Sequence, residues 1–147
     1  MSRLRMVAGK GIEDLLSAAP GALEADTAMR RLLVEQLTPR LYSLIGIVVA
    51  GSLRCQGFVE ALRGPLDQPF AAQAASDWRA LTLTAAEQAV LAYTEKGTID
   101  EASVRKRDVD ELRAVGFSDS EVLLVATTIA YHNYAIRMAA AFGVAPR

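Results

Sequence analysis

Helix start and stop signals recur along this chain, and they constrain its fold more than any other feature. Thr84 is followed three residues later by Glu87, and Ser118 by Glu121, which is the spacing of a capping box. Each box precedes an apolar segment that ends near a glycine, a common helix terminus. A strand would need polar and apolar residues to alternate between turn signals, and we find no such segment. The sequence therefore predicts an all-α domain.

Prolines, glycines and capping residues bound the remaining predicted helices. Thr27 is expected to cap a helix, and Thr38 followed by Pro39 is expected to open an apolar helix. Gly51 is expected to interrupt that helix, and another is expected to begin at Ser52. The predicted helices cover residues 12–18, 28–36, 39–50, 52–62, 70–80, 85–97, 104–115 and 119–142.

Small residues line one side of the predicted helix that follows Thr38. Ser43, Gly46 and Ala50 lie three or four residues apart, so they share a helix face. Such a stripe lets a neighbouring helix approach closely. We therefore expect another helix to pack closely against this face.

Length and composition predict a single packed domain that associates with copies of itself. The chain has 147 residues, of which 52% are hydrophobic and 22% charged, so it can bury a core without metals or disulfides. Residues 1–147 are taken as one helical domain, with residues 1–26 as a looser N-terminal extension. The mean hydropathy of +0.20 exceeds what a domain of this size can bury, which favours a dimer, trimer or hexamer formed through apolar helix faces.

Charge and residue counts argue against several classes of function. The 16 basic and 17 acidic residues nearly balance, and the basic run Arg105–Arg107 is followed at once by Asp108, so no nucleic-acid partner is expected. One cysteine and one histidine exclude an intramolecular disulfide and a clustered zinc site, and we expect neither a metal nor a cofactor. The apolar segment 41–53 is too short to span a membrane, and segment 122–144 carries polar residues at its centre. With no apparent signal peptide, the cytoplasm is the expected location.

Cys55, the only cysteine, is the first candidate for chemistry. It follows Gly51 near the expected start of a helix and adjoins Arg54. A helix N-terminus and a neighbouring cation both favour the thiolate, the reactive form of the side chain. A buried cysteine that packs as a small hydrophobic residue would have the same local sequence, and both interpretations remain open.

Several segments, in order, resemble the AhpD-like superfamily of alkylhydroperoxidases and carboxymuconolactone decarboxylases, especially its peroxidase-related branch. The resemblance covers roughly three quarters of the chain. It is carried by Leu37–Leu41, by Trp78 followed by Leu83–Leu91, by Val109–Glu121, and by Ile129–Arg137 with Phe142 and Gly143. The resemblance implies an AhpD-like helical bundle.

The family's chemical motif is a glutamate, a Cys-x-x-Cys pair and a histidine, and this chain matches only part of it. The resemblance implies that Cys55 stands where the second cysteine attacks the peroxide. Ser52 replaces the first cysteine, which would resolve the oxidised thiol as a disulfide. Val59 replaces the histidine and Arg40 the glutamate, so the implied proton relay is missing. Arg40 is expected to face Cys55 if the two helices run in line, and its charge could then favour the thiolate.

His132 is the second candidate. It lies on an apolar helix face, where a histidine that makes one hydrogen bond in the core is the ordinary interpretation. The alternative is that His132 approaches Cys55 and replaces the missing base, which requires hydrogen-bond distance directly or through one water. Asn133 and Arg137, one turn apart, are expected to tie helices together rather than bind substrate.

These observations lead to three functional hypotheses. The first is a one-cysteine hydroperoxide reductase of the AhpD-like type, with a small hydroperoxide as substrate and an external thiol as reductant. The alternative is a catalytically inactive family member that acts as a helical ligand-binding or interaction protein. A decarboxylase-like enzyme is the weakest hypothesis, because His132 alone does not form the histidine or carboxylate cluster that it would need.

Overall fold

The computed structural model describes residues 11–146 and confirms the all-α class. Apart from one isolated bridge between Gly11 and Ala145, that range holds no β-structure. Three short 3-10 turns accompany the helices. The helices are α1 (Ile12–Leu16), α2 (Ala22–Gln36), α3 (Pro39–Ser52), α4 (Val59–Leu62), α5 (Gln68–Asp77), α6 (Ala85–Ile99), α7 (Lys106–Ala114) and α8 (Asp119–Phe142).

The predicted capping interactions are confirmed at three helices. The Thr38 hydroxyl accepts a hydrogen bond from the Leu41 N–H at 3.1 Å, and Pro39 occupies the first turn of α3. Both capping boxes form, at Thr84 before α6 and at Ser118 before α8. These contacts join residues three apart, so they need no tertiary structure to specify them.

Several predicted boundaries are wrong, and three of them have a clear local reason. Thr27 does not begin a helix, because α2 already begins at Ala22, after Gly21 in the left-handed region with φ of 80°. Helix α5 begins at Gln68 because the Asp67 carboxylate accepts the Phe70 N–H at 2.9 Å. Helix α6 continues past Gly97 to Ile99, since a single glycine weakens a helix without ending it.

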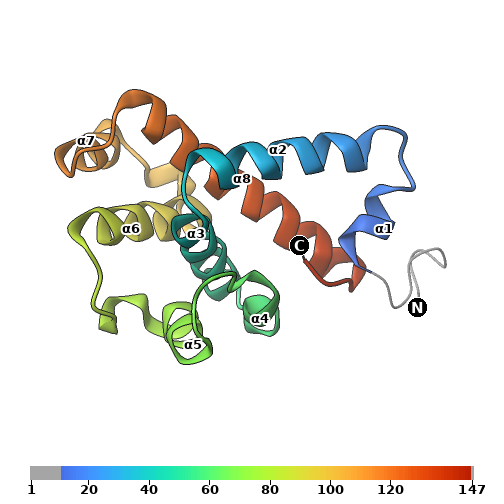
Figure 1. The fold of residues 1–147 in the computed structure, drawn as a ribbon. Helices are drawn as coiled ribbons and strands as arrows, with labels where there is room; N and C mark the ends of the chain where they lie inside the picture. Colours follow the sequence, from blue (N-terminus) through green and yellow to red (C-terminus); the bar gives the residue numbers. More distant parts are fainter. Residues whose placement is uncertain (1–10, 147) are drawn as a thin grey trace.

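Helix α3 is the central element, and another helix packs closely against its small-residue stripe, as expected. It passes through the middle of the bundle in Figure 1, and every residue from Ser43 to Ala50 is buried. Gly46 lies against the ring of His132 on α8, where a Cβ atom would come within 2.6 Å of the imidazole Cε1. At its other end, Gly51 lies against the backbone of α5 at Ala75. Glycine is needed at both positions because two elements come into contact there.

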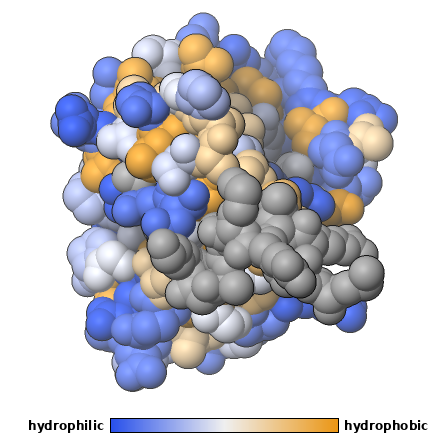
Figure 2. All heavy atoms as spheres, turned by 90° about the vertical axis from the view of Figure 1, so that its right-hand side faces the viewer, coloured by the Kyte–Doolittle hydropathy of each residue, from blue (hydrophilic) through white to orange (hydrophobic). Residues whose placement is uncertain are grey.

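Two hydrophobic clusters make up the core. The larger joins α3 to α5, α6, α7 and α8 between Val122 and Ile136, and the smaller joins α1 and α2 to the start of α3 and the second half of α8. The face at the α1 end of the molecule mixes hydrophobic patches with hydrophilic residues (Figure 2). Residues 1–10 of the expected N-terminal extension lie outside the described range, and the looser packing of residues 1–26 stays a prediction.

No single helix within residues 11–146 is long and apolar enough to cross a membrane, whereas α2 and α3, bent by 119°, pass that test only as a pair.

Candidate thiol site and buried polar cluster

Cys55 lies in the turn that ends α3, and this corrects the predicted helix over residues 52–62. The Arg54 N–H donates to the Gly51 carbonyl at 3.0 Å, and the Cys55 N–H donates to the Ala50 carbonyl at 2.8 Å. Arg54 adopts the left-handed region with φ of 58°. These are the two bonds and the left-handed residue of a Schellman motif, which closes the C-terminus of a helix. Beyond Cys55 come only the 3-10 turn Gln56–Phe58 and the four residues of α4.

The surroundings of the thiol therefore differ from the expected helix N-terminus. A helix C-terminus carries partial negative charge, and the turns beyond Cys55 are too short to supply an opposing dipole. The Cys55 Sγ is half-buried and donates to the Leu53 carbonyl at 3.6 Å. That hydrogen bond requires the protonated thiol. Within residues 11–146, no acid, base or cation forms a hydrogen bond with this side chain.

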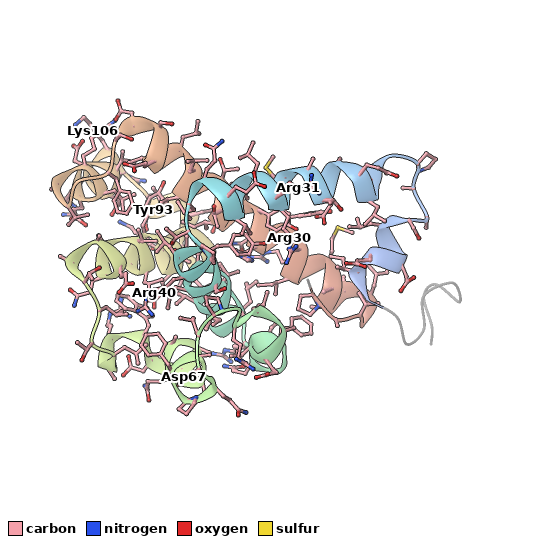
Figure 3. All side chains as sticks on the ribbon, in the orientation of Figure 1. Arg30, Arg31, Arg40, Asp67, Tyr93 and Lys106 are labelled. Atoms are coloured by element: carbon pink, nitrogen blue, oxygen red, sulfur yellow. The ribbon has the colours of Figure 1, made fainter. Side chains whose placement is uncertain are left out.

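Arg40 does not adjoin Cys55. Both Arg40 and Ser52 belong to α3, so their Cα atoms are separated by twelve residues of helix, about 18 Å along its axis. The Arg40 Nε instead donates to the Glu87 carboxylate at 2.6 Å, and the guanidinium lies over the ring of Phe70 (Figure 3). This ion pair raises the pKa of Arg40 and lowers the pKa of Glu87. The charge of Arg40 is therefore neutralised by Glu87, at the end of α3 that lies far from Cys55.

Ser52 and Val59 fall into different surroundings. Ser52 lines a cavity of about 170 Å³ between α3, α5 and α6, together with Trp78 and Glu95, whereas Cys55 does not line it. The Glu95 carboxylate there accepts the Trp78 indole N–H at 2.8 Å and pairs with Arg79. Val59 is half-buried at the start of α4 and packs against the larger core cluster. Ser52 therefore lines a cavity that Cys55 does not reach, whereas Val59 and Cys55 pack against the same core cluster.

His132 is a core histidine, which is the ordinary interpretation of its sequence pattern. It is 1% exposed, and its Nε2 lies 3.0 Å from the Tyr42 main-chain carbonyl. Because a carbonyl only accepts, Nε2 carries the proton, and Nδ1 is left as a buried acceptor without a hydrogen-bond partner. Burial lowers the pKa of His132 to about 4, so the ring is neutral at pH 7.

The structure does not bring His132 and Cys55 together. His132 contacts α3 at Tyr42 and Gly46, whereas the backbone of Cys55 is held at Ala50, about 6 Å further along the helix axis. No hydrogen bond within residues 11–146 joins the two side chains or links both to one partner. The predicted substitution of His132 for the missing base is therefore not supported by the geometry.

A cluster of buried polar side chains lies around His132, and sequence reasoning missed it. The rings of Tyr42 and His132 have centroids 4.5 Å apart, and those of Tyr131 and His132 are 5.8 Å apart. Burial raises the pKa of both tyrosines, and Arg30 on α2 acts in the opposite direction. Arg30 lies between α2 and α8 in Figure 3. The residues come from three helices, so no local spacing could indicate them.

Within residues 11–146, no group of three or more His, Cys, Asp or Glu side chains is arranged to hold a metal ion.

Three solved structures share this architecture. An uncharacterized peroxidase-related protein from Silicibacter sp. TM1040 is 23% identical and aligns over 92% of this chain and 75% of its own, with a TM-score of 0.84. An uncharacterized peroxidase-related protein with an alkylhydroperoxidase AhpD core, from Ralstonia eutropha JMP134, is 21% identical over 90% and 74% of the chains, with a TM-score of 0.74. A protein of unknown function from Agrobacterium tumefaciens, described as a candidate AhpD antioxidant defence protein, is 23% identical over 90% and 95%, with a TM-score of 0.71.

No protein-family model and no curated protein sequence matches this chain. The likeness to known proteins is therefore structural, and at these identities it concerns the arrangement of the helices. That arrangement agrees with the order of segments from which the resemblance was drawn. The chain has the all-α fold of the AhpD-like, peroxidase-related proteins.

Proposed function

We propose that this protein is an AhpD-like, peroxidase-related protein whose redox chemistry is reduced to one thiol, Cys55. The proposal rests on one observation above the others: the lone cysteine of the chain is half-buried in the turn directly after the central helix. Ser52, three residues earlier, cannot form a disulfide with it. A reaction at Cys55 therefore needs a reductant from outside the chain.

The proposed reaction balances with a hydroperoxide and two external thiols. The Cys55 thiolate attacks the terminal oxygen of the hydroperoxide, the O–O bond breaks, and the alkoxide leaves as an alcohol after taking a proton. The resulting sulfenic acid condenses with one external thiol to a mixed disulfide and releases water. A second external thiol then attacks that disulfide and frees Cys55. The net change converts one hydroperoxide and two thiols to one alcohol, one water and one disulfide.

Peroxide consumption and sulfenylation test this proposal directly. Purified protein is given cumene hydroperoxide with dithiothreitol as reductant, and the loss of peroxide is followed for the wild type, Cys55→Ser and Ser52→Ala. We expect Cys55→Ser to abolish the protein-dependent rate and Ser52→Ala to keep it, with a sulfenic-acid probe labelling Cys55 only after peroxide. A wild-type rate equal to that of Cys55→Ser would overturn the proposal.

A second candidate function, a catalytically inactive ligand-binding or interaction protein, has specific support. The Cys55 Sγ donates to the Leu53 carbonyl, and the hydrogen bonds of Arg40 and His132 go to Glu87 and to the Tyr42 carbonyl instead. The pH dependence of alkylation separates the two functions. Rapid reaction of native Cys55 with iodoacetamide at pH 6 favours the peroxidase, and reaction no faster than that of a free thiol peptide favours the inactive protein.

Location and partners follow from the same proposal. A low-molecular-weight thiol is abundant in a reducing compartment, so we place the proposed reaction in the cytoplasm. The partners would be a small hydroperoxide and that thiol, with neither nucleic acid nor membrane involved.

A further inference from the structure

A groove between α6 and α8 lies apart from the thiol turn and has the features of a separate binding site. Its volume is about 660 Å³, within the range of small-molecule sites, and neither Ser52 nor Cys55 lines it. The floor is apolar and built from small or branched residues on the two helices: Gly97, Ala126, Ile129 and Ala130. Tyr93, labelled on α6 in Figure 3, lines it as well.

A chain of hydrogen bonds runs from the core to the edge of this groove. The Thr98 hydroxyl donates to the Thr94 carbonyl at 2.8 Å, and both threonines are buried. The Asn133 amide donates to the Thr98 hydroxyl at 3.1 Å and to the Ile129 carbonyl at 3.0 Å. With both amide hydrogens engaged, the Asn133 Oδ1 is fixed in direction, and it accepts the Arg137 Nε–H at 3.2 Å. The position of Arg137 in the groove is therefore set by the hydrogen-bonded series of Thr94, Thr98 and Asn133.

The charge of this arginine is not used inside the protein. No carboxylate within residues 11–146 pairs with Arg137, whereas Arg40, Arg63, Arg79 and Arg113 each have an ion-pair partner. Because Asn133 occupies only the Nε–H, the two terminal nitrogens remain as a pair of donors. A pair of guanidinium nitrogens matches the two oxygens of a carboxylate and forms parallel hydrogen bonds with it.

We propose that this groove binds a small carboxylic acid with an apolar tail. The carboxylate pairs with the terminal nitrogens of Arg137, and the tail lies on the floor formed by Gly97 and Ala130. Glu101, which also lines the groove, disfavours a ligand with a second negative charge and so selects monocarboxylates. The site is separate from Cys55 and does not depend on the proposed peroxidase function.

Binding of octanoate to the intact protein tests the proposal. Isothermal titration calorimetry would compare octanoate with 1-octanol and octylamine. All three have the same tail, but 1-octanol is uncharged and octylamine carries a positive charge. Octanoate is expected to bind most tightly, and Arg137→Gln to weaken it by about tenfold or more, because a charge-assisted bidentate contact is lost. Arg31→Gln on α2 removes an exposed arginine outside the groove and is expected to leave the affinity unchanged.

A second variant tests the groove itself. Ala130→Leu fills the floor of the groove at an exposed position on α8, so the fold should be kept while the affinity for octanoate falls. Cys55→Ser, outside the groove, should leave the affinity for octanoate unchanged. The proposal is overturned if octanoate binds no better than 1-octanol, or if Arg137→Gln binds it as the wild type does. It is also overturned if Ala130→Leu changes only the sedimentation coefficient, which would make the groove a contact between copies of the chain.

Discussion

His132 and Gly46 bring the central helix and α8 into close contact. The imidazole lies on the Cα atom of Gly46, so the ring takes the volume that any larger side chain would need. His132 also donates to the Tyr42 carbonyl one turn earlier in α3. This pair therefore sets the distance between the two helices at the centre of the molecule.

Gly46→Ala is expected to destabilise the protein by about 1–3 kcal/mol, the usual effect of adding a methyl group to a well-packed core. The free energy of unfolding, measured with urea, checks this. The double variant Gly46→Ala, His132→Ala should lose less stability than the sum of the losses in the two single variants, because the smaller side chain at position 132 leaves room for the methyl group. Additive losses would show that the contact is not close.

The buried imidazole also makes stability depend on pH. Burial lowers the pKa of His132 to about 4 from its ordinary 6.5. Between these values the unfolded chain binds a proton that the folded protein does not, so the free energy of unfolding falls as the pH falls. The loss amounts to about 3 kcal/mol across that window.

His132→Gln is expected to remove this part of the pH dependence while lowering stability at pH 7. Urea unfolding at pH 7 and at pH 4.5 would measure the difference for both proteins. The wild type should lose distinctly more stability than the variant over this interval. Equal losses would contradict a neutral, buried His132.

At the scale of the element, the end of α3 is closed by a residue in an unfavourable conformation. Arg54 adopts the left-handed region, where a Cβ atom costs about 1–2 kcal/mol and where glycine is usual. Arg54→Gly should therefore raise the free energy of unfolding by about 0.5–1 kcal/mol, after the greater flexibility of glycine in the unfolded chain is subtracted.

Thermal unfolding would check this effect. Gln56→Gly, two residues on in a 3-10 turn, is the control and should leave stability unchanged or lower it, because this position needs no left-handed backbone. A lower melting temperature for Arg54→Gly would contradict the assignment. A stabilised variant would also show that the turn around Cys55 can be strengthened without touching the thiol.

At the scale of the whole molecule, α2 carries an apolar face that the described residues do not cover. Met29 and Leu32 are 41% and 43% exposed, and the exposed Ala25 and Ala28 continue the stripe along the same side of α2. We propose that copies of the chain associate through this face, in line with the high hydropathy of the sequence.

Leu32→Glu is expected to shift the assembly toward the monomer of 15.8 kDa, because it places a charge in the centre of the proposed contact. Sedimentation velocity of the wild type and the variant measures this shift. Leu123→Glu, on an exposed position of α8, is the control and should keep the wild-type mass. A monomeric wild type at micromolar concentration would contradict the proposal.

Much of the fold could be predicted from the sequence because the relevant contacts are local. Thr84 with Glu87 and Ser118 with Glu121 specify helix starts through bonds between residues three apart. The small-residue stripe correctly indicated that another helix packs closely against α3. Thr27 and Gly97 were misleading. A threonine starts a helix, and a glycine ends one, only where the neighbouring residues also favour a helix end, and α2 and α6 continue through these two positions.

The sequence by itself determined the fold class and the N-terminal caps of α3, α6 and α8. Only the tertiary structure decided the surroundings of the lone thiol, because Gly51 packs against α5 and lets α3 continue to Ser52. It also decided that Arg40 pairs with Glu87, 47 residues away, and that His132 rests on Gly46. Such contacts depend on how helices pack, and spacing along the chain carries no information about partners that distant.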